Sequence, residues 1–330
     1  MIRAISILTL LLCTLEISAA QDQVANVNQE QDFLPSEPEV AYAPTRRLTV
    51  EALFLKRSQS FAGTLAVDED NGQSPILTGQ DLKFSTTAGP RITLGWDRDE
   101  LSSFEATYFG LHDWTSSAGT FGNNNRSLPG DLGLATFDFF AADSIRANYG
   151  SRIHNVELSY ISKYDRLEVL GGFRYLGVYE DFTLSSFDAD TFQSNYNITA
   201  DNNLFGGQTG IRYTFESQYF SIKPQGKIGV FGNSNSQHSI VRDLNNSLEL
   251  RNVRLGENAT CLLGEIRLDG EARLTQNISL NVGYNFIWVN HLALAPYQTD
   301  FSDTAASSRF VDNAHSLFLH GVNVGATITW

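Results

Sequence analysis

The sequence predicts an all-β protein: a single antiparallel up-and-down transmembrane β-barrel of about ten strands. Two observations predict this fold. In residues 315–330, apolar side chains alternate with polar or small ones, and the run ends on an aromatic residue. Along the whole chain, long connections alternate with short ones, as they do in bacterial outer-membrane barrels. Because side chains alternate across a strand with a period of two, each such strand presents one face to lipid and the other to the lumen.

The composition favours strands and excludes two other classes of protein. The chain has 26 Gly, 22 Phe and 12 Tyr, but only 8 Pro and one Met. Its net charge of −14 argues against a nucleic-acid-binding protein, which typically carries a basic patch. Beyond the N-terminal segment there is no run of apolar residues long enough to predict a transmembrane helix.

The N-terminal 45 residues are expected to precede the barrel. Residues 1–20 have the features of a signal peptide, with Arg3, an apolar stretch, and the small residues Ser18-Ala19-Ala20 at the cleavage site. Residues 21–45 are rich in Gln, Glu and Pro, which predicts a disordered periplasmic leader. Residues 46–330 are expected to form the barrel. Cys261 is the only cysteine beyond the signal peptide, so no intramolecular disulfide is expected.

The strand candidates are 46–57, 82–96, 101–112, 149–162, 166–180, 203–215, 218–232, 259–274, 277–290 and 315–330. Long loops are expected between them at about 58–81, 113–148, 181–202, 233–258 and 291–314. Short turns are expected at 97–100, 163–166, 216–218 and 275–277. In bacterial barrels the long loops are extracellular and the short turns periplasmic, which places both termini in the periplasm. Twelve strands are the alternative, if residues 232–255 contain a further hairpin.

Outward-facing residues predict where the barrel meets lipid. Aromatic residues near the strand ends are expected to form two girdles, and these are Trp96, Tyr175, Tyr179, Tyr213, Phe215, Phe231, Trp288 and Trp330. The outward face of the last strand consists of Val322, Val324, Ala326, Ile328 and Trp330. We expect this face to act as the assembly signal that the barrel-assembly machinery recognises.

The strand positions that alternate with the lipid-facing ones point into the predicted lumen, and many of them are charged. There are seven acidic and seven basic side chains, and these are Glu51, Arg91, Glu105, Glu157, Glu168, Arg174, Arg212, Lys223, Lys227, Glu265, Arg267, Asp269, Glu271 and Arg273. In one interpretation they line a narrow aqueous pore and set its ion preference. In the other they pair across the lumen and fill it, because small barrels are filled by side chains and balanced charges favour pairing.

Four segments resemble a known family. They are GPRITLG (89–95), GGFRYLGVYED (171–181), NNLFGGQTG (202–210) and GEIRLDGEARLTQNISLNVGYNFIWVNHLALAPYQ (264–298). They are similar to the outer-membrane β-barrel porin family 7, and the resemblance extends over nearly the whole chain after residue 45. It implies a barrel in the bacterial outer membrane and, through the porin label, transport.

Two functions are therefore expected. The first is a narrow porin-like channel for small solutes or ions. The alternative is a closed barrel with a structural, adhesion or envelope-anchoring role through acidic extracellular loops. The expected partners are outer-membrane lipid, lipopolysaccharide and the barrel-assembly machinery, whereas nucleic acid is not expected.

Catalysis is not expected. Asp312, His315 and Ser316 lie together at the top of the last strand, and His291 enters the same loop. These residue types fit general-base chemistry. However, neither a G-x-S-x-G nor an H-E-x-x-H motif occurs in the sequence. The sequence therefore predicts no catalytic residue, no cofactor and no metal site.

Overall fold

The computed structural model describes residues 45–58 and 61–330. The predicted signal peptide, and the leader except for its last residue, lie outside the described residues. Almost all regular structure in the described part belongs to one antiparallel sheet. No helix among the described residues is long and apolar enough to cross a membrane.

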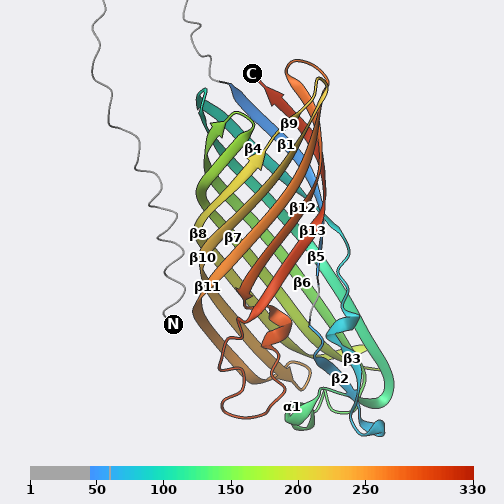
Figure 1. Ribbon diagram of the computed structural model, residues 1–330. Helices are drawn as coiled ribbons and strands as arrows, with labels where there is room; N and C mark the ends of the chain where they lie inside the picture. Colours follow the sequence, from blue (N-terminus) through green and yellow to red (C-terminus); the bar gives the residue numbers. More distant parts are fainter. Residues whose placement is uncertain (1–44, 59–60) are drawn as a thin grey trace, which may run out of the picture. The chain divides into compact units, whose positions relative to one another are not determined.

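The long strands form a closed ring (Figure 1). They are β1 (Arg46–Arg57), β4 (Thr87–Asp99), β5 (Ser102–Ser127), β6 (Ala142–Tyr164), β7 (Leu167–Asp188), β8 (Thr191–Tyr213), β10 (Phe220–Asp243), β11 (Leu248–Arg273), β12 (Ile278–Leu292) and β13 (His315–Thr329). Each pairs antiparallel with its neighbours. The ring closes where β13 pairs with β1, from Arg47 opposite Thr329 to Arg57 opposite Leu319. The predicted all-β barrel is therefore confirmed.

Residues 232–255 do not add a hairpin to this ring. They form the ends of β10 and β11, which stay paired up to Asp243 opposite Leu248. Three short strands are β2 (Thr64–Asp68), β3 (Ser74–Thr78) and β9 (Phe215–Glu216). β2 pairs with β3 and with the end of β5, and β9 pairs with β10.

The predicted loops at 113–148, 181–202 and 233–258 are wrong in large part, because most of these residues continue the strands. β5 and β11 have 26 residues each, and β7 has 22. A tilted membrane strand needs only about 9–11 residues. The wall therefore continues well beyond the thickness of a bilayer.

The wall has two halves that differ in which face is apolar. In the half next to the short turns, which we call the belt half, outward side chains such as Phe173, Ile211 and Ile266 are apolar and exposed. In the other half, which we call the far half, outward residues such as Thr183 and Asn197 are polar, while inward ones are apolar and buried. The apolar outer face of the belt half is the surface that fits a bilayer.

Three connecting segments, which we call the infolded segments, lie in the far half (Figure 1). Their buried side chains fill its interior. The first, residues 61–84, contains β2, β3 and the short helices η1 (Glu69–Asn71) and η2 (Gly79–Asp81). The second, residues 128–141, contains α1 (Gly130–Ala135), and the third, residues 293–314, contains η3 (Ala295–Gln298). Their buried residues pack with strand residues into one apolar core, whose members include Leu65, Leu77, Leu132, Phe139 and Leu294.

Phe231 is not part of a girdle, so this prediction was wrong. Its ring is buried inside the barrel. Two inward glycines give it room, since a Cβ added at Gly206 would lie 2.7 Å from Cδ1 of Phe231 and one at Gly229 would lie 2.5 Å from Cε2. The parity of β10 therefore turns Phe231 inward, with the buried Ser221 and Gln225.

The first prediction tests the lipid-facing parity. Leu268 lies on the outer face of the belt half and is 51% exposed, whereas Leu250 lies on the same face of β11 in the far half and is 43% exposed. We expect Leu268→Arg to destabilise the inserted barrel by about 2–4 kcal/mol, because arginine is then placed in hydrocarbon. Leu250→Arg should change the stability of the barrel little, because this position lies outside the belt half. Urea unfolding of both variants in liposomes measures the difference, and equal losses would contradict the assignment of the belt.

Candidate functional site

The inward charges of the belt half form three connected groups, which we name by their distance from the short turns. The rim layer contains Arg47, Glu105, Glu168, Arg212, Lys223, Gln225 and Glu271. The middle layer contains Glu51, Arg91, Arg267, Asp269, Asn285 and Asn323. The inner layer contains Asn155, Glu157, Arg174, Gln208, Lys227 and Glu265.

The rim layer is centred on Arg212, which comes from β8. Its guanidinium donates to both carboxylate oxygens of Glu105, at 3.2 and 2.9 Å, and to Glu168 at 2.8 Å. Its Nε donates to Gln225 at 2.8 Å, and Arg47 adds a second contact to Glu105 at 2.7 Å. One arginine on β8 thereby contacts side chains of β5, β7 and β10.

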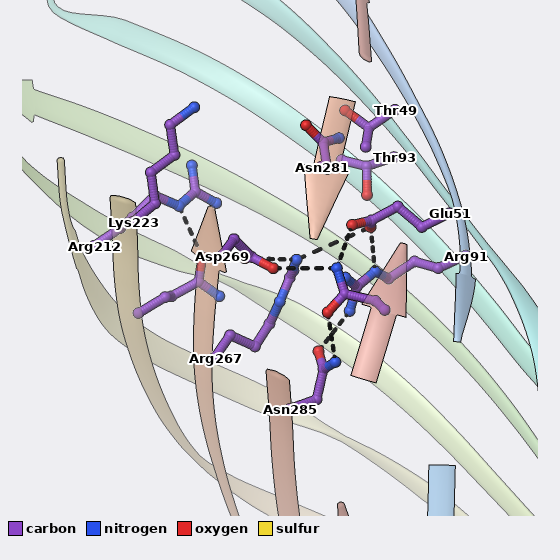
Figure 2. Close-up of polar contacts among 12 residues, drawn as sticks. Thr49, Glu51, Arg91, Thr93, Arg212, Lys223, Arg267, Asp269, Asn281 and Asn285 are labelled. Atoms are coloured by element: carbon purple, nitrogen blue, oxygen red, sulfur yellow. Dashed lines mark hydrogen bonds and ion pairs between the residues drawn. The ribbon is translucent and has the colours of Figure 1, made fainter. Parts of the chain in front are cut away.

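The middle layer is centred on the ion pair between Arg91 and Glu51, which are direct neighbours on β4 and β1 (Figure 2). Arg91 Nε donates to Glu51 at 2.6 Å, and its NH1 donates to Asn285 at 2.8 Å. Asn323 donates to the other oxygen of Glu51 at 2.6 Å. Arg267 pairs with Asp269 at 2.8 Å within the same group.

The inner layer is the most enclosed. Arg174 lies between two carboxylates, 2.7 Å from Glu265 and 3.5 Å from Glu157. Lys227 donates to Glu157 at 2.7 Å, and Gln208 donates to the same oxygen at 2.8 Å. The side chains of these four charged residues are at most 8% exposed. Each buried charge therefore has an opposite charge within reach, as burial requires.

Thirteen of the fourteen residues that the sequence placed in the lumen belong to these three layers. The exception is Arg273, whose half-exposed side chain pairs with Glu216 at the end of the barrel. The outward face predicted for the last strand is also where the structure places it, with Val322, Val324, Ile328 and Trp330 exposed and Ala326 partly exposed.

The sequence analysis missed a buried ion pair above the inner layer. Arg57 donates to Glu180 at 2.7 Å and to the hydroxyl of Tyr149 at 3.0 Å, and Tyr149 donates to Glu180 at 2.7 Å. Glu180 also accepts from the backbone N–H of Ala295, which ties the third infolded segment to the wall. The alternation of side chains along β1 could have predicted that Arg57 points inward, because Arg47, Glu51 and Arg57 share one face of the strand.

The third infolded segment is fastened at several further points. Asn202 makes two hydrogen bonds to the backbone of Ala293, at 2.7 and 2.9 Å. Arg251 donates to the carbonyls of Asp300 and Ser302. Burial raises the pKa of the Asp300 carboxyl, but hydrogen bonds from Ser302 and Ser308 outweigh this and hold the pKa below its ordinary value. This loop is therefore a fixed part of the core.

The described part of the barrel interior contains a polar recess. A polar cavity of about 230 Å³ lies in the rim layer, with Arg212, Lys223, Glu271 and Arg267 among its lining residues. Beyond it, the inner layer and the apolar core fill the cross-section with buried side chains.

The residues considered for catalysis do not form a triad. His315 Nε2 lies 3.0 Å from Asp312, but Ser316 is on the opposite face of β13 from His315. The exposed His291 contributes its carbonyl, which accepts from Asn233 at 3.1 Å. Within residues 45–58 and 61–330, there is no group of three or more His, Cys, Asp or Glu side chains arranged to hold a metal ion.

The second prediction concerns the inner layer. We expect Arg174→Ala to destabilise the barrel by about 3–5 kcal/mol, because it leaves Glu157 and Glu265 buried without their shared cation. Arg273→Ala is the matched control and should cost at most about 1 kcal/mol, since its ion pair is half exposed. Urea unfolding in liposomes compares the two, and a small loss for Arg174→Ala would show that the inner layer is hydrated and open.

Several solved structures are distantly similar to this chain. The outer membrane protease OmpT from Escherichia coli has a TM-score of 0.48 at 10% identity, covering 87% of this chain and 97% of that one. A major outer membrane protein from Thermus thermophilus has a TM-score of 0.33 at 11% identity, covering 88% and 100%. The P. putida toluene transporter TodX has a TM-score of 0.35 at 8% identity, covering 87% and 89%.

The family of the chain follows from a comparison at the level of sequence. A search of curated proteins gave no match. The family model described as "Putative beta barrel porin-7 (BBP7)" matches residues 51–330. This range runs from Glu51 on β1 to the last residue and so includes nearly all of the three charged layers. The chain belongs to this family of outer-membrane β-barrel proteins.

Proposed function

We propose that this outer-membrane β-barrel protein has a closed lumen and serves as a structural or interaction protein through the surface of its far half. The observation that carries the proposal is that, beyond the cavity in the rim layer, side chains fill the interior in both halves. Paired charges fill the belt half, and an apolar core fills the far half. Through the part of the barrel that the structure describes, water and ions then have no continuous route.

The far half has the properties of an attachment surface. Its tip exposes large apolar side chains, among them Phe137 at 74% and Leu244 at 41%. Two aspartates hold these residues in place, since Asp243 accepts from the backbone N–H groups of Phe137 and Asp138, and Asp138 accepts from that of Asn245. A rigid tip loses little conformational entropy when it binds a partner. In this proposal the far half is extracellular and both termini are periplasmic.

A narrow porin-like channel for small solutes or ions is the second candidate. The description of the family favours it, and so does the polar cavity of about 230 Å³ in the rim layer. Conduction would require the inner layer and the third infolded segment to move aside together. The two candidates therefore differ in whether ions cross the folded barrel.

The third prediction is electrical. We expect the refolded protein to show no discrete conductance steps in a planar bilayer at any salt concentration, because no aqueous path crosses the inner layer. Heat-modifiable migration on a gel verifies that the inserted protein is folded. Steps that scale with salt would support the channel and contradict the closed barrel.

The fourth prediction uses Cys261, which is buried inside the barrel and donates to the carbonyl of His291 at 3.2 Å. In folded protein comprising residues 21–330, we expect it to resist a charged methanethiosulfonate reagent until the chain is unfolded. The control is Asn258→Cys in a Cys261→Ser background, which places a thiol on the exposed outer face of the same strand and should react at once. Rapid labelling of Cys261 in the folded state would mean that water reaches the interior.

A further inference from the structure

The outer face of the belt half has a hollow of about 600 Å³. It extends across β7, β8, β10, β11, β12 and β13, and its lining is almost entirely apolar. The side chains that line it include Val169, Ile211, Ile228, Ile266 and Trp288. In the proposed setting this face contacts the hydrocarbon of the bilayer, so the hollow opens towards lipid.

Two outward glycines create the hollow. Gly226 on β10 is opposite Ile266, and Gly264 on β11 is opposite Ile228, so the glycines are diagonal neighbours. A Cβ at Gly226 would have no atom within 4 Å, and one at Gly264 would have only a carbon of Trp288 at 3.9 Å. Packing within the barrel therefore does not require glycine at these positions, and the space above them is open.

The hollow follows a row of paired residues across the wall. The row, which we call the trough, runs through Val169, Ile211, Gly226, Ile266 and Phe286, which line the hollow, and ends at His320, which lies beyond this lining. Five strand spacings of about 4.8 Å give it a length of roughly 24 Å. Strands tilted by about 35–45° make such a row descend roughly 15 Å along the barrel axis. That depth is about half of a 30 Å hydrocarbon core, the share of one leaflet.

The end of the trough towards the far half carries basic side chains. Lys56 on β1 is directly opposite His320 on β13, and both are on the outer face. Lys56 has no carboxylate partner among the described residues. His320 Nδ1 is hydrogen-bonded to the hydroxyl of Tyr284 at 2.8 Å. Basic groups at the edge of a membrane attract the phosphates of anionic lipids.

We propose that the trough binds an acyl chain of an anionic lipid of the surrounding bilayer, with the lipid phosphate beside Lys56 and His320. The apolar lining, the length of one leaflet and the basic end all match this occupant. The rings of Phe286, Trp288 and Phe318 line the hollow on the side of β12 and β13. The site does not depend on whether the lumen is open.

Native mass spectrometry of the purified protein tests the proposal. Delipidated protein is titrated with phosphatidylglycerol, and in parallel with phosphatidylcholine that has the same acyl chains. We expect wild type to bind one phosphatidylglycerol in preference to phosphatidylcholine. Gly226→Leu combined with Gly264→Leu fills the hollow and should weaken this binding by at least about tenfold. Lys56→Gln should remove the preference for phosphatidylglycerol.

The matched control combines Gly232→Leu with Gly270→Leu. These glycines lie on the same two strands, six positions from Gly226 and Gly264, and outside the hollow; a Cβ there would make only contacts of 3.6 Å or longer. The control should bind lipid as wild type does. Equal binding by the filled variant and the control would overturn the proposal. So would a wild-type dimer that the filled variant does not form, since a second copy would then occupy the trough.

Discussion

The closed ring of backbone hydrogen bonds is the constraint on which the rest of the structure depends. In hydrocarbon, every backbone N–H and C=O must be satisfied within the protein, and pairing of β1 with β13 achieves this. Closure fixes the register of each strand, and register fixes which residues point inward. Charges such as Glu157 and Arg174 are thereby enclosed, and enclosed charges are tolerated only in pairs. The three layers follow from ring closure and parity together.

The far half keeps the same parity, but its apolar and polar faces are exchanged. On β7, Phe173 is outward and exposed while Arg174 is inward; further along, Thr183 is outward and Leu184 is buried. The strand backbone is continuous through both halves, so the orientation of the side chains does not change. What differs between the belt half and the far half is the environment of the outer face. Outward side chains in water are polar, and the hydrophobic effect then collects apolar side chains inside. The infolded segments complete that core, which begins where the charged layers of the belt half end.

Parity within the belt half was predictable because alternation is a local property of each strand. It placed residues such as Glu51 and Arg91 inward from the sequence alone. The lengths of the strands were not predictable in the same way, since the pattern reverses beyond the belt and residues such as Asn197 resemble a loop. The contact of Glu180 with Ala295 was also out of reach, because it joins segments far apart in the chain. The period of a sequence pattern predicts which face of a strand a side chain is on. Which other side chains it contacts depends on the tertiary fold.

The proposed lipid site and the inner layer share the same stretch of backbone. Lys227 and Glu265 are inward and directly opposite each other, while their neighbours Gly226 and Gly264 are outward. The charged side chains approach to 3.8 Å on one face, and the glycines leave the other face hollow. Ion pairing inside therefore holds β10 and β11 in register beneath the trough. The inner layer thus has a role whether or not ions cross the barrel, because it fixes the surface that meets lipid.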